Sequence, residues 1–169
     1  MIDGRMLQPL RDELARNDSR WLASDRAAVL LALGEPDLAL KAVEEGLAVR
    51  GQDSWRNSMS EAGQLGHIYA RLKRRADAER VLAVAKKLAV NPTGLSDIHH
   101  TQFSIGCGLA LLGKADEAVL WLTKAANEGY PSYPRFSTDP DLSSLKGHGG
   151  FDALLERLRA DHERWRTTL

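Results

Sequence analysis

The sequence predicts an all-α protein, a right-handed solenoid of three helical hairpins with an N-terminal helix before them and a C-terminal capping helix after them. Its 169 residues match the size of one domain. Leu and Ala supply 48 of these residues, whereas Val, Ile and Thr supply 17, so helix-favouring residues far outnumber strand-favouring ones. Apolar residues also recur at helical spacing, and this pattern repeats along the chain.

Glycine and proline divide the first 130 residues into segments of helical length. The turn signals are Gly34-Glu35-Pro36, Gly51-Gln52-Asp53-Ser54, Asn91-Pro92-Thr93-Gly94 and Gly113. Because these residues end helices, we expect a helix around Met6 to Arg16 and then three hairpins. The single domain, residues 1–169, thus comprises an N-terminal helix (1–18), three hairpins (19–52, 53–93 and 94–130) and a capping segment with a terminal helix (131–169).

Small residues repeat in phase in the three hairpins. An alanine follows an acidic residue near the start of each second helix, and these alanines are Ala39, Ala78 and Ala118, 39 and 40 residues apart. Twelve positions before each one stands another small residue, namely Ala27, Gly66 or Gly106. Nine positions before stands a larger one, namely Leu30, Tyr69 or Leu109. A small residue where two helices cross and a large one three positions later are what stacked helical hairpins require.

The second and third hairpins resemble the tetratricopeptide repeat family. The residues that carry the resemblance are Leu65-Gly66-His67-Ile68-Tyr69 with Ala78, and Ile105-Gly106-Cys107-Gly108-Leu109 with Ala118. The period of 39 to 40 residues exceeds the family's usual length of about 34, so each unit needs longer helices or a longer connection. The resemblance implies that the first helix of each pair lines a concave groove.

The last forty residues differ from the repeats. Tyr130-Pro131-Ser132-Tyr133-Pro134-Arg135-Phe136 alternates aromatic residues with prolines, which prevents a long helix, and we expect it to lie across the end of the array. Asp139-Pro140-Asp141-Leu142 predicts a helix start, and Phe151, Leu154, Leu155 and Leu158 predict a final amphipathic helix. This segment resembles the one that closes repeat arrays in many bacterial regulatory proteins, which implies a scaffold and no particular reaction.

Composition excludes several classes of function. The 23 basic and 23 acidic residues balance, so the chain lacks the excess of positive charge typical of nucleic-acid-binding domains. The longest apolar run, Ala27 to Leu33, is far shorter than the roughly 20 residues of a membrane span. Cys107 is the only cysteine, so neither an internal disulfide nor a multi-cysteine zinc site can form. With no leader segment at the N-terminus, we expect a cytoplasmic protein that binds neither nucleic acid nor membranes.

The sequence offers no strong catalytic motif. His99, Phe103 and Cys107 follow one another at four-residue intervals, but the two turns between His99 and Cys107 span about 11 Å, too far for a shared zinc ion. No phosphate-binding loop, zinc-protease motif or nucleophile elbow is present. We therefore expect a protein that is not an enzyme and holds no cofactor or metal. An enzyme in which His67, His100 and Cys107 converge is the weakest alternative.

The predicted function is protein or peptide binding, as a non-catalytic scaffold or adaptor. Carrying the family register onto this chain gives these candidate groove residues: Trp21, Ser24, Ser60, His67, Arg71, His100, Phe103 and Cys107. The alternatives are self-association into a homo-oligomer through Tyr130 to Phe136 or an exposed hairpin face, and a regulatory or sensory domain from a larger bacterial signalling or transcription protein. For Trp21 and Phe103, packing between helices is the favoured role and peptide binding the alternative.

Overall fold

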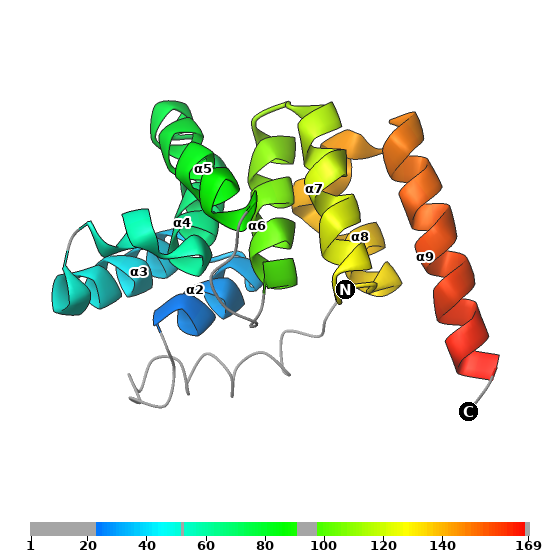
Figure 1. Cartoon of the computed structure of the whole chain (residues 1–169), viewed down its shortest axis with the longest axis horizontal. Coiled ribbons are helices and arrows are strands. Elements are labelled where there is room, and N and C mark those ends of the chain that lie inside the picture. The colour runs from blue at the N-terminus through cyan, green and yellow to red at the C-terminus, as the bar shows by residue number, and fades with distance from the viewer. Residues whose placement is uncertain (1–22, 52, 91–97, 168–169) are drawn as a thin grey trace.

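The computed structural model describes residues 23–51, 53–90 and 98–167, which form helices and no strand. The elements in chain order are α2 (Ala23–Ala32), α3 (Pro36–Arg50), η1 (Ser54–Asn57), α4 (Met59–Arg71), α5 (Arg75–Val90), α6 (Ile98–Leu111), α7 (Ala115–Asn127), α8 (Tyr133–Thr138), η2 (Pro140–Leu145) and α9 (Gly149–Thr167). The expected all-α class is confirmed for this part of the chain (Figure 1). The expected helix around Met6 to Arg16 lies outside the described residues.

Successive helices pack as pairs, α2 with α3, α4 with α5, and α6 with α7. The helix α4 also contacts both α2 and α6. The first helices of the three pairs therefore form a row with α4 in its middle (Figure 1).

The three pairs turn in the same way. Each turn contains one residue in the left-handed backbone region, and these residues are Gly34 (φ 81°), Lys73 (φ 59°) and Gly113 (φ 76°). The next N–H in the chain donates to a carbonyl of the first helix, and the donor and acceptor pairs are Glu35 and Leu30, Arg74 and Tyr69, and Lys114 and Leu109. These bonds satisfy carbonyls that a helix end leaves unpaired, so each first helix ends by the same local geometry.

Two glycines allow close helix crossings in the second and third pairs. A Cβ atom on Gly66 would lie 2.6 Å from Cδ2 of Leu82, and one on Gly106 would lie 2.7 Å from Cδ2 of Leu122. Ala27 has the corresponding place in the first pair and no exposed surface. The alanines of the second helices, Ala39, Ala78 and Ala118, are equally inaccessible. The small residues singled out in the sequence are therefore all buried where helices meet.

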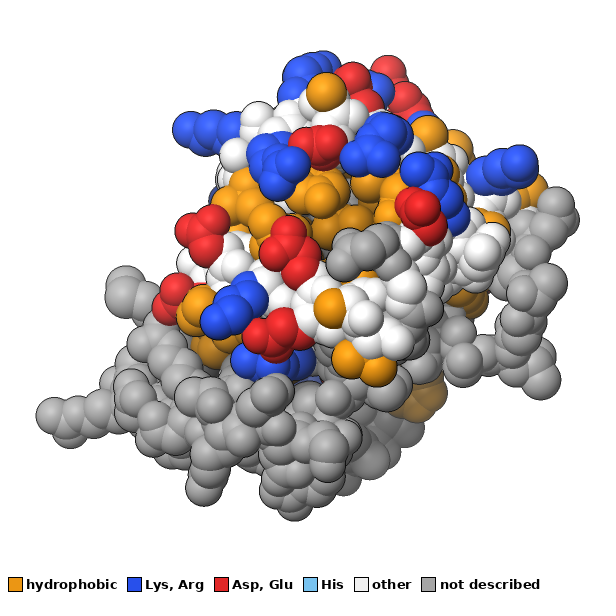
Figure 2. Space-filling model, turned by 90° about the vertical axis from the view of Figure 1, so that its left-hand side faces the viewer, with side chains coloured by type: hydrophobic (Ala, Val, Ile, Leu, Met, Phe, Trp, Pro, Cys, Tyr) orange, Lys and Arg blue, Asp and Glu red, His pale blue; other side chains and the backbone are white. Residues whose placement is uncertain are grey.

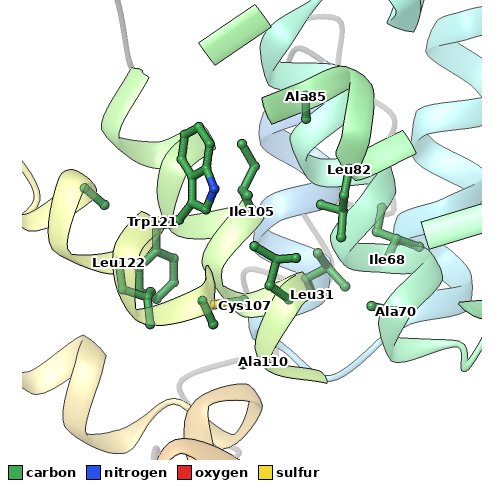
Figure 3. Close-up of a cluster of buried hydrophobic side chains, with 14 of the residues drawn as sticks. Leu31, Ile68, Ala70, Leu82, Ala85, Ile105, Cys107, Ala110, Trp121 and Leu122 are labelled. Atoms are coloured by element: carbon green, nitrogen blue, oxygen red, sulfur yellow. The ribbon is translucent and has the colours of Figure 1, made fainter. Parts of the chain in front are cut away.

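One hydrophobic core runs through the hairpins. Its buried side chains include Ile68 and Leu82 of the second pair and Ile105 and Leu122 of the third, and all four are at most 1% exposed (Figure 3). Because such a core is densely packed, the crossing distance at each glycine affects the packing around it.

The C-terminal segment begins with two short helical elements. The side chain of Asp139 accepts a hydrogen bond of 3.0 Å from the backbone N–H of Asp141, and Pro140 occupies the first position of η2. Leu142 and Leu145 are fully buried, and η2 packs against α6. η2 thus lies along the first helix of the third pair, and its Asp141 reaches α4.

The last helix, α9, packs on α7 and α8 through one apolar face. Phe151, Leu154 and Leu158 of that face are buried, as the sequence predicted, and Leu155 is half-buried. None of the described helices has the length and apolar character needed to span a membrane.

Arginine side chains cover aromatic rings on the outside of the hairpins. The guanidinium of Arg74 lies 4.5 Å from the ring centre of Tyr69, and those of Arg56 and Arg80 lie 4.6 and 5.6 Å from Trp55. On the side of the molecule that carries α3, hydrophobic side chains are bordered by side chains of both charges (Figure 2). This surface has no single sign of charge, in keeping with the balanced composition.

The crossing glycines give a test of the packing. Gly66→Ala forces a methyl group against Leu82, which is enclosed by core side chains, and we expect a loss of about 1 to 3 kcal/mol in the free energy of unfolding. Gly149→Ala is the matched control, because its added methyl meets nothing within 4 Å. Urea unfolding measures both variants. Equal stability of the two would contradict the close crossing.

Candidate binding cavity

A cavity of about 460 Å³ opens among the first helices of the three pairs. It is lined by Asp25, Ala28, Val29, Leu31 and Ala32 of α2, Ser60, Gln64 and His67 of α4, His100, Phe103 and Ser104 of α6, and Tyr130 and Arg135 of the C-terminal segment. Its wall therefore combines aromatic and aliphatic side chains with polar and charged ones in similar number.

The structure brings four of the predicted groove residues to this cavity. Ser60, His67, His100 and Phe103 all line it. Trp21 and the side chain of Ser24 lie outside the described residues.

Two predicted groove residues lie elsewhere. Arg71 does not line the cavity, because its guanidinium is held by groups of the protein itself. Cys107 is fully buried away from the cavity, so its placement in an open groove is wrong. Burial raises the pKa of the Cys107 thiol well above its usual value, which disfavours the thiolate that a nucleophile needs. The buried, protonated thiol therefore does not support the alternative in which His67, His100 and Cys107 act together as an enzyme.

The carboxylate of Asp141 joins the C-terminal segment to α4. Its Oδ2 lies 2.7 Å from Nε2 of His67, and its Oδ1 accepts a bond of 2.8 Å from Nε of Arg71. The side chains of Asp141, His67 and Arg71 are only 8%, 6% and 15% exposed. Because a carboxylate only accepts, the Nε2 of His67 carries the proton of this bond.

Arg71 extends this contact to a third element. Its Nη1 donates a bond of 2.6 Å to the carbonyl of Leu31, the second-to-last residue of α2. One guanidinium thus ties α4 to α2 and to η2, which fixes the edges of the cavity. The basic end of α4 also places positive charge where helix carbonyls are unpaired.

Opposing effects set the pKa of Asp141. Burial on its own raises the pKa, but the hydrogen bonds and charges of His67 and Arg71 outweigh burial and hold the pKa below its usual value. Asp141 is therefore ionised at neutral pH, and the contact is an ion pair with Arg71 as well as a hydrogen-bonded cluster.

Aromatic rings form the side of the cavity next to the C-terminal segment. The ring centre of Phe103 lies 5.2 Å from that of Tyr130 and 5.1 Å from that of Phe136, both edge-to-face. The guanidinium of Arg135 lies 5.5 Å from the ring centre of Phe103 and also pairs with Asp139 at 3.0 Å. Phe136 is fully buried, so this end of the aromatic segment is used within the chain.

Gln64 places a polar atom without a partner in this wall. The residue is 9% exposed, and its Oε1 is buried with no hydrogen bond to the described residues. A buried amide oxygen without a donor costs free energy, so this atom is one that a ligand can satisfy.

Sequence reasoning missed Gln64, Tyr130, Arg135 and the role of Asp141. The motif Asp139-Pro140-Asp141 predicts a helix start, in which Asp139 is the capping residue. It gives no structural role to the side chain of Asp141. No pattern in the sequence links residue 141 to residues 67 and 71. No described group of His, Cys, Asp and Glu side chains has the arrangement of a metal site.

Comparison of the chain with protein families, curated proteins and solved structures finds no match.

Removal of the shared acceptor tests the buried cluster. Asp141→Ala leaves the His67 and Arg71 donors without their partner, and we expect a loss of about 2 to 4 kcal/mol in the free energy of unfolding. Asp116→Ala is the matched control, since Asp116 also pairs with a histidine, His148, but is fully exposed. For it we expect a change within about 0.5 kcal/mol in urea unfolding. Similar losses in both variants would show that the cluster adds nothing beyond a surface pair.

The lowered pKa of Asp141 predicts how acid affects stability. Folding lowers this pKa below that of an aspartate in the unfolded chain, which is about 3.9. The ionised carboxylate therefore stabilises the folded state when the pH is above about 3.9. This contribution fades as the pH falls toward the pKa of Asp141 in the folded state. The difference in free energy of unfolding between wild type and Asp141→Asn should therefore shrink as the pH falls below about 4. Urea titrations across this range measure it. A constant difference in strong acid would contradict the assigned ionisation.

Proposed function

We propose that this protein is a tetratricopeptide-like array, a right-handed solenoid of three hairpins, that binds a protein or peptide and catalyses no reaction. Three left-handed turn residues in phase, with the same carbonyl-capping bond after each, support a true structural repeat. The glycine crossings at Gly66 and Gly106 support the close hairpin packing that such repeats use.

The observation that carries the binding proposal is the cavity between the first helices. Those helices line the concave face in the family that the sequence resembles, and four residues predicted for that face line the cavity. A wall that mixes rings and aliphatic side chains with polar groups suits a peptide side chain, which needs both apolar contact and hydrogen bonds.

Self-association is less well supported. The segment from Tyr130 to Phe136 was the surface expected to pair with a second copy, and Phe136 and Tyr130 instead contact Phe103 of the same chain. We also propose a cytoplasmic location, because the chain has one cysteine and that thiol is buried.

Selection of peptides tests the binding proposal directly. We expect the immobilised wild-type protein to enrich members of a random peptide library displayed on phage. Ala28→Trp should abolish the enrichment, because Ala28 lines the cavity and is exposed, so a large ring there fills the space without disturbing the core.

The matched control is Ala153→Trp, which changes an exposed alanine of α9 away from the cavity lining. It should enrich the same peptides as wild type. A folded wild-type protein that enriches no peptide, or an Ala28→Trp variant that enriches the same ones, would overturn the proposal.

A further inference from the structure

We infer that the cavity selects an arginine side chain of the bound partner, with its guanidinium donating to Oε1 of Gln64. This inference rests on the proposed peptide-binding function and adds the chemistry of the partner. It follows from the unpaired acceptor, the charges around the cavity and the rings that line it.

The unpaired acceptor requires a donor. Oε1 of Gln64 is buried and lacks a hydrogen bond within the described chain, and Gln64 lines the cavity. A second buried glutamine, Gln102, also has an unpaired Oε1, but it does not line the cavity and its Nε2 donates to Glu128 at 2.8 Å. Of these two glutamines, Gln64 is therefore the one whose side chain a ligand in the cavity can contact.

The charges around the cavity favour a cation. Arg135, which lines it, pairs with the buried carboxylate of Asp139 at 3.0 Å. Arg71, behind the wall, pairs with Asp141. Besides Arg135, one lining residue carries a carboxylate or guanidinium group. This residue is Asp25, and it is exposed. With the arginines neutralised by their own partners, the remaining charge that an incoming group meets is negative, apart from the imidazoles of His67 and His100.

The rings favour guanidinium over a compact ammonium group. A guanidinium is planar, is weakly hydrated and stacks on aromatic side chains, and it offers five N–H donors. Phe103, Tyr130 and His100 supply rings, and Val29 and Leu31 supply apolar contact for an aliphatic stem. Arg135 shows that this wall accepts a guanidinium, since its own lies 5.5 Å from the ring centre of Phe103. The volume of about 460 Å³ leaves room for a second such side chain.

Binding of small probes tests the inference. The probes are N-acetyl-arginine amide and its citrulline counterpart, which has nearly the same shape and no charge. Ligand-observed NMR at low salt measures both dissociation constants. We expect wild type to bind the arginine probe roughly 10-fold more tightly, because a hydrogen bond from a charged donor is stronger than one from a neutral group. Equal affinities, or no saturable binding of the arginine probe in the millimolar range, would overturn the inference.

Variants of the two buried glutamines assign the effect to the cavity. Gln64→Met keeps the length of the side chain and removes the acceptor, so it should weaken the arginine probe about 10-fold. Gln102→Met removes the same atoms outside the cavity and should bind as wild type does. Equal binding by both variants would contradict the role of Gln64.

The peptide selection separates this inference from the function on which it rests. Enriched peptides that contain arginine, lost with Ala28→Trp, support both. Enriched peptides without arginine that are lost with Ala28→Trp would leave peptide binding in place and refute the arginine pocket. A wild-type protein that enriches nothing would refute the proposed function itself.

Discussion

The close approach of paired helices at Gly66 and Gly106 is the constraint on which the rest of this structure depends. Each glycine lets the backbone of a first helix lie against a buried leucine of the second helix, at a distance that no Cβ atom would permit. Because the same core continues from pair to pair, this spacing also brings α2, α4 and α6 into a row. The cavity lies among those three helices. Its width therefore depends on Gly66 and Gly106, although neither residue lines it.

The C-terminal segment is part of this architecture and contributes to the cavity. Leu142 and Leu145 supply apolar burial against α6, while Asp141 supplies a charge that would be costly to bury alone. His67 and Arg71 offset that cost by pairing with both carboxylate oxygens. Buried ion pairs add little net stability compared with apolar packing, but they tolerate few alternative arrangements. The main effect of the cluster is therefore on the position of the C-terminal segment, and its effect on the net free energy of unfolding is smaller.

The sequence predicted the parts of the fold that depend on local chemistry. Gly34 and Gly113 mark hairpin turns because glycine readily adopts positive φ, and alanines in phase mark helix crossings because small residues permit them. The second turn follows the same geometry through Lys73, a residue type that gives no such signal. The cavity was predicted less well. Four of its residues follow from the repeat register, but the depth of Cys107 and the unpaired Gln64 depend on how the C-terminal segment and neighbouring helices pack, which spacing along one helix does not encode.

The contact of Asp141 with His67 joins residues 74 positions apart, whereas the hairpins are held by bonds between near neighbours in the chain. Local contacts form early because they close short loops, and a contact of this separation forms late. During synthesis on the ribosome, the first two hairpins can therefore assemble while the segment that carries Tyr130, Arg135 and Asp141 is still inside the exit tunnel. The cavity is completed only after that segment has emerged, so a nascent chain acquires its helices before it acquires its binding site.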